Sequence, residues 1–317
     1  MDGDLLQRVG ATGLLPEGEP VVVLLSGGRD STCLLDVALR LGARVRALHV
    51  HHGLRGRSAD EDAEHCAQLC AALHVPLHTE RLTPPAGGGS QAWARDARYA
   101  AAAAHAASDV ARIAVGHTAT DQVETVLYRL ATSPGRRALL GMQAQRGRLV
   151  RPLLAAGATR AQTARHCQAR GLAWREDPSN SDGSYARTRV RDGLVAALEA
   201  VDERAHANVL RTAELLRDEA EVLDEVVVTA LAGRDRISRA RLAELPPALA
   251  RLVLRRLAED ATGRLCPRAA GRLGDVLALE AGALDLGDGA RAIVESGVVR
   301  CARTPPLARR TVEPPTP

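Results

Sequence analysis

The chain alternates short apolar runs with stretches in which apolar residues recur every three to four positions. The first pattern predicts buried strands, and the second predicts amphipathic helices. The expected strands cover residues 21–25, 45–50, 76–82, 111–115 and 149–154. The expected helices cover residues 31–41, 91–107 and 119–131, and a capping box at residues 58–61 opens a further helix. This regular alternation predicts an α/β fold with a parallel, doubly wound sheet.

The pattern changes after residue 159. It is helical to about residue 231, and from residue 234 it indicates a small α+β domain. In that domain we expect a helix near residues 245–257 and β-like segments near 284–286 and 292–299. We therefore predict an α/β domain with a helical extension over residues 1–215 and a small C-terminal domain over 216–303. Residues 304–317 are rich in Pro and Arg and are predicted to be a disordered tail.

Arginine supplies every basic charge apart from histidine, because the 317 residues include no lysine. This absence excludes a Walker-A loop, a Schiff-base lysine and a lysyl-adenylate nucleophile, since each needs a lysine side chain. The net charge of +4 is compatible with a nucleic-acid partner but does not require one.

The cysteines, at positions 33, 66, 70, 167, 266 and 301, form no C-x-x-C pair. Their spacing favours small buried side chains over metal ligands. No apolar run approaches the length of a membrane span. The sequence therefore predicts a cytoplasmic protein without a membrane partner.

The turn between the first predicted strand and the first predicted helix has the clearest chemistry. Its residues are Ser26, Gly27, Gly28, Arg29, Asp30 and Ser31. A glycine-containing turn before a helix N-terminus presents backbone N–H groups to a phosphate, and the two serine hydroxyls add donors. Asp30 would repel a phosphate unless a divalent cation lay between them, so we predict Mg²⁺ at Asp30. The alternative is an ordinary strand-to-helix turn.

Polar residues also follow the second and fourth predicted strands. They are His51 and His52 after one strand, and His117, Asp121 and Glu124 after the other. Because ligands of such sheets bind at the carboxyl ends of the strands, we expect this group to share a cleft with the glycine-containing turn. The carboxylates lie on one helix face, as an acidic site for a cation or as helix caps alone. His51 and His52 contact a nucleotide or the reacting base, or are hydrogen-bonded loop residues, and zinc is not expected because no third ligand has suitable spacing.

Two groups of arginines are candidates for contacts with nucleic acid. Arg95 and Arg98 share a face of the helix predicted over residues 91–107, where they contact phosphate or are simply solvated. Arg187, Arg189 and Arg191 lie at a helix start, against the preference of the helix dipole. That conflict favours an RNA phosphate as their partner.

In this order, the motifs resemble those of the tRNA(Ile)-lysidine synthetase family of PP-loop ATP pyrophosphatases. The resemblance covers residues 21 to about 191. The motifs are Ser-Gly-Gly-Arg-Asp-Ser, His-Val-His-His-Gly-Leu-Arg, Ala-Arg-Asp-Ala-Arg-Tyr, Gly-His-x-x-x-Asp-Gln-x-Glu-Thr, Arg-Pro-Leu-Leu and Asp-Pro-Ser-Asn. The first is shared by PP-loop enzymes in general, and the joint set is more specific. One departure is Thr-Ser-Pro-Gly at residues 132–135, where the family has Arg-Gly-Ser-Gly.

The resemblance implies a ligase that joins free L-lysine to the wobble cytidine of the CAU anticodon of tRNA(Ile). It implies ATP as cosubstrate, an adenylated tRNA intermediate, and release of pyrophosphate and AMP. Residues 26–31 would hold ATP, with Mg²⁺ at Asp30. Asp121 and Glu124 would bind or position the lysine ammonium group, with His52 or His117 in a secondary polar or proton-transfer role. The expected tRNA contacts are the C-terminal domain and Arg95, Arg98, Arg187, Arg189 and Arg191.

Other classes of function stay open at this point. A PP-loop tRNA thiolase would need reactive or cluster-binding cysteines, and a GMP or asparagine synthetase would need a glutaminase segment or an ammonia channel. A regulatory module would bind ATP without consuming it. The sequence leaves the oligomeric state open, with a homodimer as one candidate.

Overall fold

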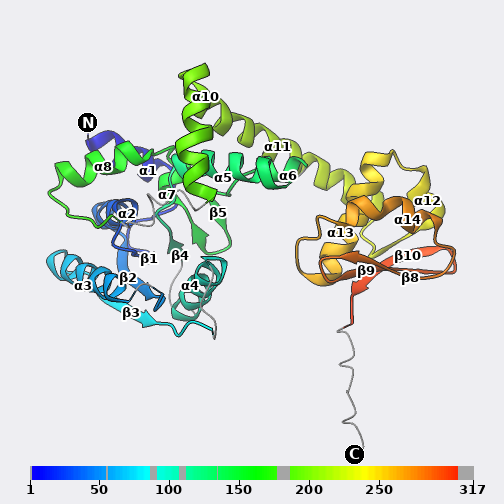
Figure 1. The fold of residues 1–317 in the computed structure, drawn as a ribbon, viewed down its shortest axis with the longest axis horizontal. Coiled ribbons are helices and arrows are strands. Elements are labelled where there is room, and N and C mark those ends of the chain that lie inside the picture. Colours follow the sequence, from blue (N-terminus) through cyan, green and yellow to red (C-terminus); the bar gives the residue numbers. More distant parts are fainter. Residues whose placement is uncertain are drawn as a thin grey trace, which may run out of the picture. The chain divides into compact units, whose positions relative to one another are not determined.

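The computed structural model describes residues 2–54, 56–85, 91–106, 112–133, 135–176 and 186–305. The chain divides into two compact units, Met1–Leu216 and Arg217–Pro317. Each unit has a sheet of its own, and the division falls within the helix α11 (Ala205–Leu231) (Figure 1). Pro134, the Asp-Pro-Ser-Asn segment and nearly all of the predicted tail lie outside the described residues.

The first unit contains a six-stranded sheet in the order β3-β2-β1-β4-β6-β5. All neighbouring strands are parallel except β5 and β6. The strands are β1 (Pro20–Leu24), β2 (Arg44–His51), β3 (Leu77–Arg81), β4 (Arg112–Ala114), β5 (Gln145–Arg146) and β6 (Leu149–Val150). The predicted parallel α/β sheet is thus confirmed, and the short antiparallel β5 was not predicted.

Helices cover both faces of this sheet. Val21 and Val23 of β1 pack in one buried cluster with α2 and α3, whereas Val22 and Leu24 pack in another cluster with α4 (Figure 1). The central strand is therefore buried on both faces, which explains its continuous apolar run. The helical elements of this unit are α1 (Asp2–Ala11), α2 (Arg29–Arg40), α3 (Arg57–Ala72), α4 (Gln91–His105), α5 (Ala119–Thr132), α6 (Arg136–Leu139), α7 (Pro152–Ala155), α8 (Arg160–Ala169), α9 (Ala186–Arg189), the π-helix η2 (Val190–Val195) and α10 (Ala196–Val201).

The fifth predicted strand is wrong beyond its first two residues. Only Leu149 and Val150 pair in the sheet, and Pro152 is the first residue of α7. Proline lacks a backbone N–H for the sheet, and its fixed φ suits the first position of a helix. The apolar run at 149–154 therefore joins a short strand to a helix.

The predicted capping box at residues 58–61 is also wrong. The N-cap of α3 is Gly56, which makes no side-chain cap, so Ser58 already lies inside the first turn. Capping boxes do occur at two other helix starts, Thr118 with Asp121 in α5 and Thr159 with Gln162 in α8. Both of these helices border the candidate site.

The second unit packs helices on a four-stranded antiparallel sheet in the order β7-β10-β9-β8. Val253 and Leu254 of α13 share a buried cluster with Val294 and Val299 of the sheet, which confirms a small α+β domain. The predicted segment 292–299 is a hairpin of two strands. The elements are β7 (Arg236–Ser238), α12 (Arg239–Glu244), α13 (Pro247–Thr262), the 3₁₀-helix η3 (Ala269–Arg272), α14 (Leu273–Ala278), β8 (Gly282–Gly287), β9 (Ala290–Glu295) and β10 (Val298–Arg303).

Candidate functional site

Hydrogen bonds between two serines fix the turn after β1. The backbone N–H of Ser26 donates to Ser31 Oγ at 3.2 Å, and the Oγ atoms of these two residues lie 3.0 Å apart. Ser31 also donates to the Gly28 carbonyl at 2.8 Å. Gly27 has a φ of 82°, a conformation that favours glycine. The result is a compact turn at the start of α2, the type of helix N-terminus that binds phosphate.

The loop between β4 and α5 lies directly against this turn. A Cβ atom at Gly116 would lie 2.9 Å from backbone atoms of Asp30 and Ser31, so the approach requires glycine. The capping box of α5 follows at once, because the Thr118 N–H donates to Asp121 Oδ2 at 2.8 Å and the Asp121 N–H donates to Thr118 Oγ1 at 3.3 Å. The starts of α2 and α5 are therefore fixed side by side.

Arg160, the first residue of α8, joins these two helix starts. Its Nη1 donates to Glu124 Oε1 at 2.7 Å, and its Nη2 donates to Asp121 Oδ1 at 2.8 Å. Its Nε lies 3.9 Å from Asp30 Oδ2. The guanidinium group therefore lies among three carboxylates that come from α2 and α5.

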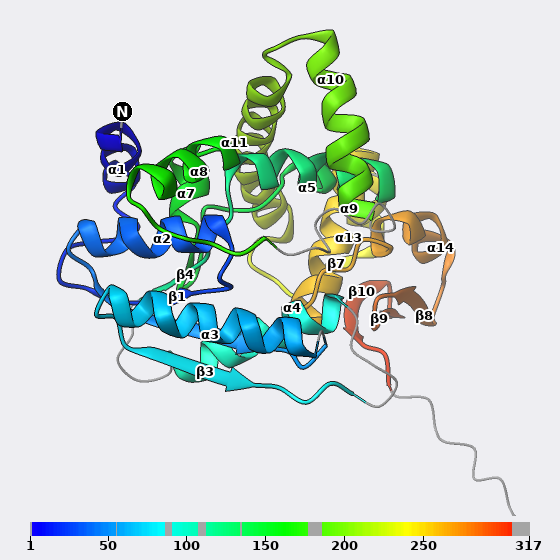
Figure 2. The ribbon, with the colours of Figure 1, turned by 60° about the vertical axis from the view of Figure 1, so that its left-hand side comes forward.

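The backbone of α8 is held in the same place. The Arg160 N–H donates to Thr120 Oγ1 at 3.2 Å, and the buried Thr163 hydroxyl hydrogen-bonds Asp30. Further along, α8 lies beside α2 (Figures 1 and 2), where His166 Nε2 and Asp36 Oδ2 are 2.8 Å apart and both side chains are buried. Contacts along both helices thus set the position of Arg160.

The pKa values of Asp30 and Arg160 are both raised, for different reasons. Burial, reinforced by the negative charge of Asp121, raises the pKa of Asp30, although the Thr163 hydrogen bond, Arg29 and Arg160 act against it. Burial lowers the pKa of Arg160, but the carboxylates of Asp121 and Glu124 outweigh it and raise that pKa. The guanidinium is therefore firmly charged, whereas Asp30 would gain from further positive charge nearby.

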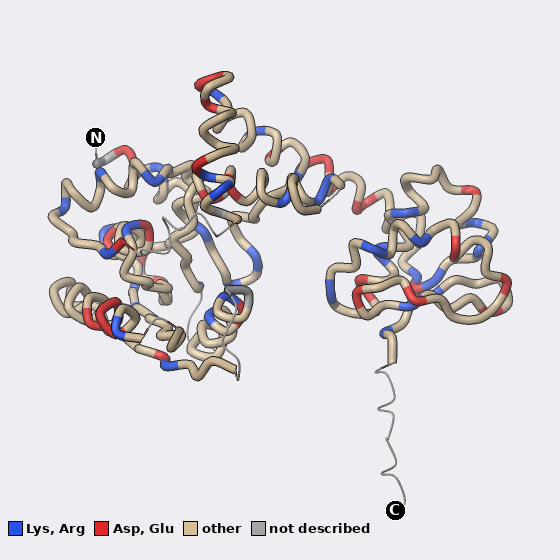
Figure 3. The backbone as a smooth tube through the Cα atoms, viewed as in Figure 1, with Lys and Arg blue, Asp and Glu red and all other residues tan. Residues whose placement is uncertain are grey.

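Arg175 closes another side of the turn. Its backbone N–H donates to the Gly27 carbonyl at 2.9 Å. Its side chain donates to Asp62 Oδ1 at 2.6 Å and to Glu61 Oε2 at 3.0 Å. These two carboxylates belong to the acidic first part of α3, which is red in Figure 3. Hydrogen bonds of Arg175 thus connect the segment after α8 to both the Ser26–Ser31 turn and α3.

Comparison with known proteins places the chain in a family. The PP-loop domain family matches residues 6–198. A tRNA(Ile)-lysidine synthase of Streptomyces coelicolor is 40% identical over 261 residues, which are 78% of this chain and 73% of the relative. Another from Gloeobacter violaceus is 38% identical over 269 residues, 80% of this chain and 81% of the relative. The chain belongs to the tRNA(Ile)-lysidine synthase family of PP-loop proteins.

The match covers a smaller share of some other relatives. The tRNA(Ile)-lysidine synthase of Pseudomonas fluorescens is 41% identical over 214 residues, 64% of this chain and 47% of the relative, so the chain spans about half of that protein. Among solved structures, a U34-tRNA thiolase of Methanococcus maripaludis has a TM-score of 0.57 and 17% identity, covering 68% of this chain and 78% of the thiolase. That likeness concerns the fold alone. As a PP-loop protein, the chain belongs to an ATP-utilising family.

In this lysidine synthase family member, the histidines lie around the site and not within the Arg160 cluster. His51 Nε2 is 3.2 Å from Asp60 Oδ1, and the His52 ring lies edge-on against Trp93 of α4. His117 Nδ1 accepts a hydrogen bond from Arg151 Nε at 3.1 Å. Since an arginine can only donate, this bond assigns the ring proton of a neutral His117 to Nε2.

The arginines predicted to contact RNA lie on two helical segments. Arg95 and Arg98 belong to α4, where Arg95 lies 5.9 Å from the Tyr99 ring and burial lowers the pKa of Arg98. Arg189 ends α9, and Arg191 follows in η2 with its Nε 2.9 Å from Asp192 Oδ1. This second segment packs on α5, because Val190 and Val195 share a buried cluster with Val123 and Leu127. The side chain of Arg187 lies outside the described part of the chain.

The sequence analysis missed Arg160, Thr163 and Arg175. A signal for Arg160 was available, because the Thr-x-x-Gln pattern at residues 159–162 marks the helix start that the structure shows. Nothing comparable marks Arg175, whose role depends on the distant residues Asp62 and Gly27.

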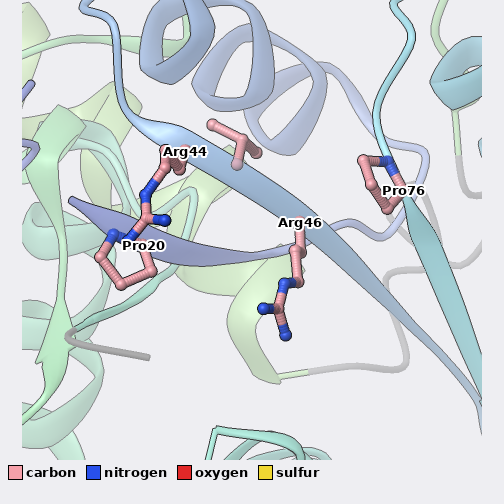
Figure 4. Close-up of a pocket in the computed structure, with 5 residues that line it drawn as sticks. Pro20, Arg44, Arg46 and Pro76 are labelled. Carbon is pink, nitrogen blue, oxygen red and sulfur yellow. The ribbon is translucent and has the colours of Figure 1, made fainter. Parts of the chain in front are cut away.

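A hollow in the first unit lies at the opposite edge of the sheet. It is lined by Pro20, Arg44, Val45, Arg46 and Pro76, at the amino ends of β1, β2 and β3 (Figure 4). None of these lining residues is acidic. No group of three or more His, Cys, Asp or Glu side chains suited to a metal ion occurs in the described part of the chain, and no helix there is apolar enough over its length to cross a bilayer.

Proposed function

We propose that this chain is an ATP-dependent ligase that joins the side-chain amine of free L-lysine to the wobble cytidine of a tRNA(Ile) with a CAU anticodon. Relatives at about 40% identity carry the name tRNA(Ile)-lysidine synthase. The observation that carries the proposal is the meeting of the Ser26–Ser31 turn with Asp121 and Glu124 around Arg160. A nucleotide phosphate and a charged amine then bind within one site.

The proposed reaction has two steps. In the first, the ring carbonyl oxygen O2 of the cytidine attacks the α-phosphorus of ATP, and pyrophosphate leaves. In the second, the lysine ε-amine attacks C2, the C2–O bond breaks, and AMP leaves while the amine loses a proton. The first step converts a poor leaving oxygen into a phosphate ester, which makes C2 open to attack by an amine.

The turn would hold the phosphates of ATP through its backbone N–H groups and the hydroxyls of Ser26 and Ser31. Mg²⁺ fits beside it, because the carboxylate of Asp30 is partly exposed at the turn and gains from positive charge. Such an ion is commonly held by one or two carboxylates together with substrate phosphates, and it neutralises phosphate charge. In this proposal Asp30 holds the ion, and Arg29 neutralises the same carboxylate at 3.3 Å.

The amine must be presented in its neutral form. The side-chain pKa of lysine is about 10.4, so deprotonation at pH 7 costs roughly 4–5 kcal/mol. In the proposal, Asp121 and Glu124 hold lysine by an ammonium group, and His52 or His117 has a secondary role. His117 accepts at Nδ1, so in this state it suits donation from Nε2 better than general-base catalysis.

RNA contacts are proposed for Arg95, Arg98, Arg187, Arg189 and Arg191 and for the second unit. The packing of η2 on α5 supports this assignment for Arg189 and Arg191, because α5 also carries Asp121 and Glu124. The wobble base must leave its stack to reach a site at the sheet edge, which costs less in an anticodon loop than in a duplex. Such an enzyme would work in the cytoplasm, where its tRNA is found.

The test combines the purified chain with ATP, radiolabelled lysine and a tRNA(Ile) transcript with a CAU anticodon. Label in the tRNA, with one AMP per lysine, is the expected result. A matched transcript with G in place of the wobble C is the control and should take up no label. AMP release without label would indicate a different adenylating enzyme, and neither product would indicate a module that only binds nucleotide.

A further inference from the structure

Within the cluster at Arg160, the arginine side chain is the most exposed member. The side chains of Glu124 and Asp121 are 2% and 11% exposed, whereas that of Arg160 is 25% exposed. Asp30, at 20%, is the only carboxylate of the described cluster that comes near this value. Asp121 and Glu124, which the sequence suggests as a cation site, accept hydrogen bonds from the Arg160 side chain in the structure.

Hydrogen bonds position Arg160 and leave one donor of its guanidinium group available to a ligand. The capping box of α8 and the bond from the Arg160 N–H to Thr120 fix the start of the helix. The side chain uses its Nη atoms on Glu124 and Asp121. Its Nε is 3.9 Å from Asp30, beyond hydrogen-bond length, and has no hydrogen-bond acceptor among the described residues. A ligand with oxygen acceptors would satisfy such a donor.

The proposed chemistry decides which end of lysine belongs here. A carboxylate near an ammonium group favours the charged form, so the acidic cluster would keep an ε-amine protonated and unreactive. The α-ammonium group takes no part in the reaction, so its charge does no harm. Its carbon also bears a carboxylate, and the cluster offers a carboxylate and a guanidinium only 2.8 Å apart, at Asp121 Oδ1 and Arg160 Nη2.

We infer that Arg160 binds the α-carboxylate of the lysine substrate and is the residue that distinguishes the amino acid from a simple diamine. This inference rests on the proposed function and assigns the α-end of lysine to the cluster, which directs the ε-amine away from it. The remaining Nε–H of the guanidinium group would donate a charge-assisted hydrogen bond to that carboxylate. The phosphates of ATP have donors of their own in the Ser26–Ser31 turn.

The experiment compares lysine with cadaverine, which keeps both amines and lacks only the carboxylate. Initial rates are measured with ATP and the CAU transcript, and the product is identified by mass spectrometry of the digested tRNA. For the wild-type protein, kcat/KM should favour lysine by about ten- to a hundredfold, the size expected for a charge-assisted pair. In Arg160→Gln that preference should fall to about threefold or less, and Arg160→Lys should restore part of it.

The matched control is Arg165→Gln, an exposed arginine of the same helix. It should keep the full preference. The ratio is internal to each variant, so a general loss of activity does not disturb it. The inference is overturned if the wild-type protein does not distinguish the two amines, or if Arg160→Gln keeps the preference. It is equally overturned if Arg160→Gln raises the KM for ATP and leaves the ratio unchanged, because the guanidinium would then serve phosphate.

Failure of the proposed function gives a different result. In that case the wild-type protein forms no product with either amine. Thermal stabilisation by lysine and by cadaverine is then measured in the presence of a non-hydrolysable ATP analogue. Stabilisation by lysine alone, lost in Arg160→Gln and kept in Arg165→Gln, would support the carboxylate site. Equal stabilisation by both amines, or none by either, would overturn it.

Discussion

Arginines lie at both the carboxyl edge of the first sheet, where its parallel strands end, and the amino edge, where they begin. The surroundings of these arginines differ. At the carboxyl edge, Arg160 is largely buried and lies among carboxylates from two helices. At the amino edge, Arg44 and Arg46 are exposed and line a hollow without an acidic residue (Figure 4). Among the described residues, the Arg44 side chain donates to a backbone carbonyl, that of Gly18, at 2.7 Å. The proposed site therefore lies at buried, paired charge and not at this hollow.

The difference has a physical basis. Taking charges out of water costs several kcal/mol per ion, and packed apolar side chains would often be as stable as a buried ion pair. A cluster such as Asp30, Asp121, Glu124 and Arg160 is therefore weak evidence for stability and better evidence for function. The exposed arginines of the amino edge carry no comparable cost.

The largest effect is expected when the side chain of Asp30 is removed from the carboxyl edge. In Asp30→Ala, ATP–pyrophosphate exchange with the CAU transcript should fall by about a thousandfold or more, because the loss of a metal-binding carboxylate removes several kcal/mol of charge stabilisation. Glu64→Ala, at an exposed carboxylate of α3, is the control and should keep its exchange rate. Exchange at the wild-type rate in Asp30→Ala would remove this residue from the proposed metal role.

The next effect concerns the stability of the carboxyl edge. Asp36→Asn breaks the buried pair with His166 that aligns α2 and α8, and loss of one partner of such a pair costs roughly 3–5 kcal/mol. Urea unfolding, followed by circular dichroism, measures the change. A free energy of unfolding within about 1 kcal/mol of the wild-type value would show that the pair does not hold these helices together.

The same pair predicts how stability depends on pH. Burial alone would raise the pKa of Asp36, but the hydrogen bond from His166 and the charges of Arg170 and His166 lower it below 3.8. A group with a lowered folded-state pKa contributes stability above its unfolded value, and this contribution is lost as the pH falls through the folded value. The difference between wild type and Asp36→Asn should therefore be constant near neutral pH and should shrink below about pH 4.

The carboxyl edge also shows what the sequence reveals and what it hides. The strand before Ser26 and the Asp-x-x-Glu pattern in α5 are local, so periodicity and spacing predict both. Arg160 and Thr163 contact Asp30 across more than a hundred residues, and such pairings leave no local pattern. The strand predicted over 149–154 fails for a local reason, since an apolar run does not by itself distinguish a strand from the first turn of a helix.

A smaller effect is expected where Arg189 is proposed to contact RNA. Arg189→Ala should weaken tRNA binding by about three- to tenfold and reduce its dependence on salt, because one phosphate contact is lost. The KM for ATP should not change. Filter binding at several salt concentrations measures the effect, with Arg165→Ala as the control. Unaltered affinity and salt dependence would remove Arg189 from the RNA-binding surface.

The smallest effect is expected at the amino edge, and it decides whether the comparison holds. Arg44→Ala removes an exposed side chain that donates to one carbonyl, so stability should change by about 0.5 kcal/mol or less and lysine transfer by less than about twofold. Both are measured beside Arg160→Gln. If Arg44→Ala lowered transfer as much as Arg160→Gln does, the hollow of Figure 4 would belong to the active machinery, and buried charge would lose its value as the marker of the site. If only Arg160→Gln lowers lysine transfer, the reaction depends on the carboxyl edge, where Arg160 lies among carboxylates.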